Sequence, residues 1–302
     1  MTNLITLLVH TPLLLLNLVQ DLHDMLSLDF MRYAFLAGTP IAIVCGLVGY
    51  FVVLRDLTFA TEALAHVTFT GALLAVVVGS DALLGLFGVT VIVALGISVL
   101  GTRAQVKDVE VGTVLAWILG LGALCLSIYT SQSSGGNSTI GVNYLFGSLF
   151  GLQAQQAKLV AVIGIGIIVV LLVITRPLLF ASLDPEVART RGVPVQGISA
   201  VFMLLVALTI AQAVPAVGAL LNSALIVTPA AIAHRLVARP FVALFLSAGL
   251  SLAFVWIGLI IGFYAPYPVS FLISTLAFVT YVAVVTWQWL STASLSRLVN
   301  KT

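Results

Sequence analysis

Apolar residues fill this chain in long runs that are separated by short polar stretches. A helix needs about 20 consecutive apolar residues to cross the hydrocarbon core of a bilayer. Eight runs reach or approach that length, at residues 34–54, 57–79, 82–101, 111–131, 157–176, 197–219, 241–263 and 268–289. The pattern therefore predicts a bundle of membrane-spanning helices.

Two further runs are shorter. Ser223–Leu236 has about 14 residues and contains Pro229. It predicts either a kinked helix that completes a crossing begun near Leu220, or a short span packed inside the bundle. Leu4–Val19 has neither a basic start nor a small-residue cleavage site, so it does not read as a signal peptide, and it either spans or lies in the interface. We expect about nine membrane helices, within a range of eight to ten.

Composition supports this fold class. Hydrophobic residues make up 61% of the 302 residues and charged residues 7%, against about 25% charged in soluble domains. These values exclude a soluble globular or disordered protein. The net charge of +2 gives no case for nucleic-acid binding, and Cys45 and Cys125 lie in apolar runs, which excludes a disulfide scaffold. The sequence thus predicts an all-α, polytopic helical membrane protein in contact with the lipid bilayer.

The basic residues predict an orientation. If Arg55 is cytoplasmic and the runs alternate, ten of the 12 basic residues are cytoplasmic, and only Arg32 and Lys158 are not. This is the bias of the positive-inside rule, and it requires the Pro229 segment to cross. We divide the chain into an N-terminal apolar or interfacial segment (1–33), a transmembrane domain (34–290) and a cytoplasmic tail (291–302).

One span carries ionisable groups well inside its limits. Glu62 and His66 are four residues apart in the run 57–79, so they share one helix face about a turn apart. A charge inside the bilayer costs at least about 2.5–3.5 kcal/mol on insertion scales, which makes such residues functional candidates. Carboxylate and imidazole suit Zn, Mn or Fe as ligands. A hydrogen-bonded pair that joins helices and a proton relay are the alternative interpretations.

A second polar group lies near two prolines. Asn222 falls between Pro215 and Pro229, and prolines inside spans free backbone carbonyls and permit bends. The group predicts a hinge or a pathway-lining surface. Interhelical hydrogen bonding by Asn222 explains it equally well.

The loop after the run 157–176 predicts a short helix. Asp184 is a natural N-cap, Pro185 suits the first helical position, and Glu186 favours the positive end of the helix dipole. Gly192 then ends the helix and Pro194 prevents its continuation. This two-turn element is either an interfacial anchor or a docking element for a cytoplasmic partner.

Several signatures of energy conversion and hydrolysis do not occur. The sequence has no GxxxxGK[ST] phosphate-binding loop, no HExxH and no GxSxG nucleophile within a span. We therefore expect no enzyme activity in this chain.

Taken together, the motifs resemble a known family, the permease subunits of ABC transporters for zinc, manganese or iron uptake. The similarity runs from about residue 29 to residue 289 in matching order, through Leu54–Phe59 followed by Glu62–His66, Leu145–Gly147, Asp184–Ala188 with Gly192, and Ser223–Ala231. Two positions depart from the family pattern. Glu62 stands where Asp is usual, which adds one methylene and could shift the ion's position, and Thr70 stands where Pro usually precedes Gly71.

The resemblance implies a homodimeric pore with two cytoplasmic ATP-binding subunits and an extracytoplasmic metal-binding protein, in the cytoplasmic membrane of a prokaryote. It implies that Glu62 and His66 contact the transported Mn, Zn or Fe, that ATP binds the partner subunit, and that this chain binds no cofactor. The segment Asp184–Gly192, including Ala188 and Arg189, would couple to the ATPase. The main alternative is a secondary transporter with the pair as a proton or ion relay; an intramembrane enzyme would need a nucleophile or third ligand that is not evident.

Overall fold

Helices make up nearly all of the structure. The computed structural model describes residues 25, 27–101, 108–132 and 139–299, and these residues form no β-strand. The helices are α3 (Asp29–Leu54), α4 (Thr58–Val77), α5 (Ala82–Gly101), α6 (Asp108–Gln132), α7 (Thr139–Phe146), the 3₁₀ turn η1 (Leu149–Gly151), α8 (Ala154–Leu183), α9 (Pro185–Thr190), α10 (Val195–Val217), α11 (Asn222–Leu236), α12 (Pro240–Tyr264) and α13 (Val269–Val299). The all-α prediction is confirmed, whereas the run Leu4–Val19 lies outside the described residues.

Six helices are long and apolar enough to cross a membrane, namely α3, α4, α8, α10, α12 and α13. Helices α5 and α6 contain shorter apolar stretches, and α11 has 15 residues. These nine helices of the described chain agree with the expected count. Their limits differ in places from the apolar runs: α8 continues past residue 176 to Leu183, and α13 continues past residue 290 to Val299.

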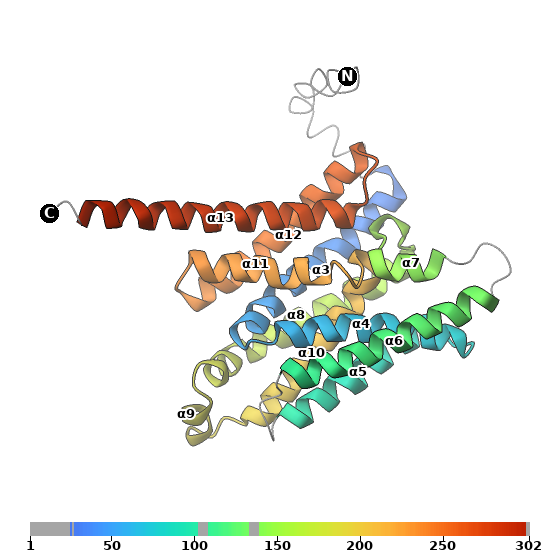
Figure 1. The fold of residues 1–302 in the computed structure, drawn as a ribbon, viewed down its shortest axis with the longest axis horizontal. Helices are drawn as coiled ribbons and strands as arrows, with labels where there is room; N and C mark the ends of the chain where they lie inside the picture. The colour runs from blue at the N-terminus through green and yellow to red at the C-terminus, as the bar shows by residue number, and fades with distance from the viewer. Residues whose placement is uncertain (1–24, 26, 102–107, 133–138, 300–302) are drawn as a thin grey trace, which may run out of the picture.

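The short elements α7 and α9 lie at opposite ends of the bundle, which we call the α7 end and the α9 end (Figure 1). Helix α11 starts at the α7 end, where the amide of Leu220 donates to the carbonyl of Leu145 at 3.2 Å. Its last turn contacts the second half of α13, since the Gln288 side chain donates to the Arg235 carbonyl at 2.8 Å. Helix α11 therefore runs from the α7 end toward the α9 end, as the charge pattern requires of the Pro229 segment.

Helix α3 forms the centre of the bundle and packs against α8, α11 and α12 (Figure 1). Two of its glycines allow neighbouring backbones to approach closely. An added Cβ at Gly46 would lie 2.5 Å from the Ala248 Cα in α12, and one at Gly49 would overlap the carbonyl oxygen of Ile226 in α11. Small residues at such positions permit the van der Waals packing that holds membrane helices together.

The segment between α7 and η1 crosses the break between α10 and α11. Gly147 and Gly218 have φ of +72° and +97°, and an added Cβ on either would overlap the main chain of the other segment. Such φ values are accessible to glycine at no steric cost. Backbone hydrogen bonds from Ala219 to Tyr144 (3.0 Å) and from Ser148 to Pro215 (3.1 Å) join the two segments. This crossing fixes the position at which α11 begins.

Candidate metal-ion site

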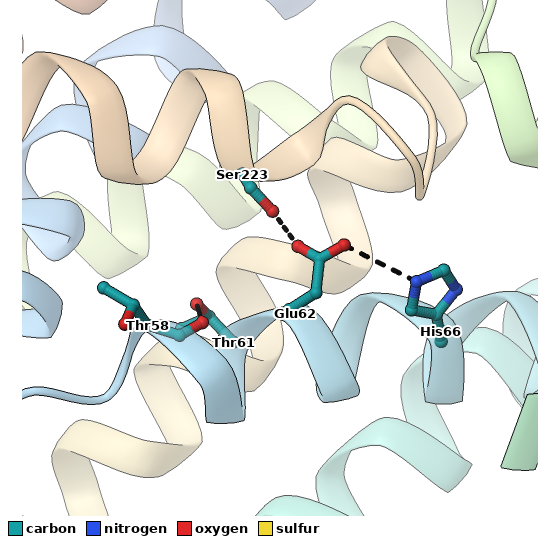
Figure 2. A network of polar contacts seen from close by, with 5 residues as sticks. All are labelled: Thr58, Thr61, Glu62, His66 and Ser223. Carbon is teal, nitrogen blue, oxygen red and sulfur yellow. Dashed lines mark hydrogen bonds and ion pairs between the residues drawn. The ribbon is translucent and has the colours of Figure 1, made fainter. Parts of the chain in front are cut away.

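Glu62 and His66 lie on one face of α4, one turn apart, as the spacing predicts (Figure 2). The Glu62 Oε1 and His66 Nε2 atoms are 3.5 Å apart. The His66 side chain is 10% exposed and that of Glu62 is 30% exposed. The carboxylate is therefore the more accessible of the two groups, with the imidazole behind it.

A third side chain, on α11, completes this network. The Ser223 hydroxyl donates a hydrogen bond to Glu62 Oε2, so the two carboxylate oxygens have different partners (Figure 2). These residues are 161 positions apart in the sequence, and the crossing of Gly147 and Gly218 sets where Ser223 lies. The hydroxyl fixes the rotation of the carboxylate and leaves Oε1 facing the imidazole.

The contact also sets the depth of the site. Ser223 lies 12 residues before Arg235 on α11, which is about 18 Å along a helix axis. Glu62 lies only four residues after Thr58, the first residue of α4, or about 6 Å. The first residue of α4 thus lies closer to the Glu62–Ser223 contact than the end of α11 does.

Several polar atoms of the described residues are buried without a hydrogen-bond partner. They are His66 Nδ1, Asn222 Oδ1 and both amide atoms of Gln212. An unpaired buried polar atom costs free energy unless a partner arrives, so each is a position at which a ligand or water would be stabilised. His66 Nδ1 belongs to the pair itself, and Asn222 is the residue next to Ser223 in α11. Gln212 instead faces α8, where a Cβ at Gly164 would lie 3.6 Å from its Oε1.

The two prolines near Asn222 lie in different helices, Pro215 in α10 and Pro229 in α11. Pro229 is buried in the middle of α11, six residues after Ser223. Pro215 lies in the last turn of α10, where its carbonyl accepts the Ser148 amide. They flank the break between α10 and α11 on either side, and Asn222 is the first residue of α11.

The predicted short helix is confirmed as α9. The Asp184 side chain accepts a hydrogen bond from the Val187 amide at 3.0 Å, Pro185 is the first helical residue, and Gly192 follows with φ of +79°. Ala188 is fully buried against Ala181. Glu186 and Arg189 are exposed, so α9 presents a polar outer face on an apolar anchor.

Groups of three or more His, Cys, Asp or Glu side chains arranged to hold a metal do not occur among the described residues. The site therefore offers one carboxylate and one imidazole, with hydroxyl and amide oxygens nearby on α11. The sequence pattern does not single out Ser223, because its role depends on a contact between distant helices.

Arg55 is a further residue whose setting the sequence does not predict. It follows α3 directly, and its guanidinium donates to the Ser182 and Ser199 hydroxyls. Burial lowers the pKa of Arg55 from its ordinary value, although an arginine stays charged at neutral pH. The side chain joins the turn before α4 to the segments on both sides of α9.

Six helices long and apolar enough to cross a membrane, packed with shorter apolar helices around a buried imidazole and a partly exposed carboxylate, define a polytopic helical membrane protein whose polar site lies on a span. Residues 27–288 match the model of the ABC 3 transport family, and the chain belongs to that family.

Its relatives agree with this assignment. The chain is 32% identical over 235 residues to the manganese transport system membrane protein MntC of Halalkalibacterium halodurans, covering 77% of this chain and 78% of the relative. It is 28% identical over 235 residues to the manganese import system permease protein ScaB of Streptococcus parasanguinis, covering 78% and 82%.

Solved structures share the fold. PsaBC from Streptococcus pneumoniae, solved in complex with Fab, superposes with a TM-score of 0.76 at 24% identity, over 88% of this chain and 95% of the matched chain. An inward-facing putative metal-chelate type ABC transporter superposes with a TM-score of 0.62 at 18% identity, over 88% and 89%.

Proposed function

We propose that this chain is the transmembrane subunit of an ATP-driven importer that moves divalent transition-metal ions across the cytoplasmic membrane of a prokaryote. Family membership supports the class. The observation that carries the cargo assignment is the Glu62–His66 pair, in which the imidazole is buried and the more accessible carboxylate is held by Ser223. The charge bias places the α9 end on the cytoplasmic side.

Glu62 and His66 are the residues that we assign to the passing ion. A structural zinc site takes four protein ligands, whereas the described residues bring together two of the usual kind here. A small donor set suits a cargo that must leave again, because conduction needs binding that is favourable but weak. The unpartnered Nδ1 of His66 and the nearby Asn222 oxygen are available for further contacts. We assign Pro215 and Pro229 to the hinge on either side of the pathway.

The metal that we favour is manganese. Oxygen and nitrogen donors without thiolate tolerate Mn, Zn and Fe alike. Both cysteines, Cys45 in α3 and Cys125 in α6, are buried free thiols rather than members of the site. The relatives MntC and ScaB are named as manganese transport proteins, which favours manganese over zinc or iron as the cargo.

The energy source in this proposal is a pair of cytoplasmic ATP-binding subunits. Helix α9 would dock them through Asp184, Pro185, Glu186, Arg189 and Gly192, while the buried Ala188 holds the helix against α8. A second copy of this chain would complete the pore, and an extracytoplasmic metal-binding protein would deliver the ion.

The test is metal uptake by the reconstituted complex. Proteoliposomes holding this chain with its ATP-binding subunits are given the metal-loaded binding protein outside and ATP inside, and radioactive Mn²⁺ uptake is measured, with Zn²⁺ and Fe²⁺ as competitors. We expect ATP-dependent uptake that Glu62→Ala and His66→Ala abolish without loss of assembly. Asp56→Asn is the matched control, because Asp56 is an exposed carboxylate six residues before Glu62.

Two results would contradict the proposal. Uptake that persists in a well-assembled Glu62→Ala/His66→Ala double variant would remove the site assignment. Uptake driven by a proton or ion gradient without ATP would instead favour a secondary transporter that uses the pair as a relay.

A further inference from the structure

The turn between α3 and α4 contains a half-buried cation, Arg55, without a carboxylate partner among the described residues. Arg55 is the residue after the last residue of α3, and it stands seven residues before Glu62. Among the described residues, no Asp or Glu forms an ion pair with its guanidinium. The charge is stabilised instead by neutral groups on two other helices.

Two hydroxyls hold the guanidinium. Arg55 Nε donates to Ser182 Oγ at 2.7 Å, and Nη1 donates to Ser199 Oγ at 3.3 Å. Ser182 itself donates to the Leu178 carbonyl at 2.6 Å, so its oxygen is oriented to accept from the arginine. The planar guanidinium donates to the two serines from two separate nitrogens, a geometry that the single nitrogen of a lysine does not reproduce.

An aromatic pair fixes the arginine from the side. The Arg55 Cζ lies 5.4 Å from the centroid of the Phe202 ring, within the range of a cation–π interaction. Phe202 packs edge-to-face on Phe51 with centroids 6.0 Å apart, and both rings are fully buried. Phe51 is in the last turn of α3, just before Arg55. The Phe202 ring of α10 is therefore contacted by both Phe51 and Arg55.

The placement of the two serines matters most. Ser182 is at the end of α8, two residues before the N-cap of α9, and Ser199 is in the first turns of α10, just after α9. One side chain therefore binds both segments that carry α9. The same residue enters the turn that leads into α4, which carries Glu62 and His66.

Because the acceptors are neutral, the hydrogen bonds of Arg55 to Ser182 and Ser199 can break and form again at low cost. Breaking a buried ion pair leaves an uncompensated charge on each side, which is strongly unfavourable. A neutral hydroxyl that loses the arginine leaves no charge behind, and Ser182 keeps its hydrogen bond to the Leu178 carbonyl. The contact is thus strong enough to hold the segments in register and can still release them during a transport cycle.

We propose that Arg55 is a positioning residue that couples movement of α9 to the Glu62 end of α4. This inference rests on the proposed function, in which α9 docks the ATP-binding subunits. A displacement of α9 pulls on Ser182 and Ser199, Arg55 transmits it to the turn, and α4 shifts the carboxylate relative to Ser223.

The test measures metal ions transported per ATP hydrolysed in the reconstituted complex. We expect Arg55→Gln and Arg55→Lys to lower this ratio at least about fivefold, the lower end of typical coupling between sites, while ATP hydrolysis continues. Ser182→Ala/Ser199→Ala should lower it similarly, and adding Arg55→Gln to that pair should lower it no further, since all three residues act in one contact. The matched control is Arg239→Gln, an exposed arginine, and it should leave the ratio unchanged.

A second readout does not depend on metal transport. In the wild-type complex, trapping the ATP-binding subunits with a non-hydrolysable nucleotide should alter amide hydrogen exchange in α9 and at residues 57–62. In Arg55→Gln the change should remain in α9 and vanish at residues 57–62. Wild-type complexes that move no metal would refute the proposed function, yet this exchange pattern would still decide the coupling.

Two outcomes would overturn the inference. One is an unchanged transport-to-hydrolysis ratio in assembled Arg55→Gln complexes. The other is a parallel loss of hydrolysis, transport and assembly in both Arg55 variants together with an unaltered exchange response at residues 57–62, which would mark Arg55 as a purely structural residue.

Discussion

Replacing Gly49 by alanine tests the packing that places Ser223 against Glu62. Gly49 faces the main chain of Ile226 in α11, and Ile226 follows Ser223 by three residues. A methyl group added there would overlap the Ile226 carbonyl oxygen and lie 2.9 Å from its carbonyl carbon. Since the obstacle is backbone, no side-chain rotation can relieve it, and α11 must move.

The size of that movement follows from the distances. Ordinary contact begins near 3.4 Å, so the carbonyl carbon must retreat by 3.4 − 2.9 = 0.5 Å, and the oxygen by more. Overpacking of this kind costs typically about 1–3 kcal/mol. Ser223 moves with its helix, and the Glu62 carboxylate loses its brace. A displacement near 1 Å can reduce the rate of a geometrically demanding step about 100-fold. We therefore expect metal uptake to fall on the order of 10-fold to 100-fold.

The assay is metal uptake in proteoliposomes together with thermal unfolding in detergent. Gly166→Ala in α8 is the matched control, because an added Cβ there meets nothing within 4 Å. It should leave uptake within about twofold, as expected for a substitution worth less than about 0.5 kcal/mol. Equal uptake and equal unfolding temperatures for the Gly49→Ala and Gly166→Ala proteins would refute the reasoning.

Three further predictions follow from single contacts. Asp184→Ala removes the α9 cap, at a cost of about 0.5–2 kcal/mol, and should weaken co-purification of the ATP-binding subunits, whereas Asp184→Ser should retain it; equal recovery with both would contradict the docking role. Ser223→Ala should slow metal uptake without loss of assembly and Ser223→Thr should restore it, and unaltered uptake in Ser223→Ala would show that Glu62 needs no brace. Gly218→Ala should lower the unfolding temperature, because a backbone with φ of +97° and ψ of 150° is essentially restricted to glycine and costs other residues about 1–3 kcal/mol even before the steric overlap; an unchanged temperature would contradict the crossing.

The parts of the structure that the sequence predicts are those set by neighbouring residues. Asp184, Pro185 and Gly192 specify α9 because caps, first-turn prolines and C-terminal glycines act within one or two turns. The shared face of Glu62 and His66 follows from helical periodicity alone. Each of these features involves residues fewer than ten positions apart.

Contacts between distant helices are the parts that sequence patterns miss. Ser223 and Glu62 are 161 positions apart, and Arg55 and Ser182 are 127 apart. In both cases the serine has its role because two helices pack together at that position. The serine itself, within an apolar run, does not indicate which distant residue it contacts. The surroundings of Glu62 also depend on such packing, since its second partner, Ser223, comes from α11.

The crossing of Gly147 and Gly218 restricts which amino-acid substitutions this protein can accept. Each glycine faces main-chain atoms of the other segment. No neighbouring side chain could therefore be shortened to make room for a larger residue at either position. A compensating second substitution, the usual route by which packed positions exchange residues, does not exist at this pair. In a saturation library selected for metal uptake, both positions should return glycine whatever else varies, and the start of α11 should tolerate neither insertion nor deletion beside them.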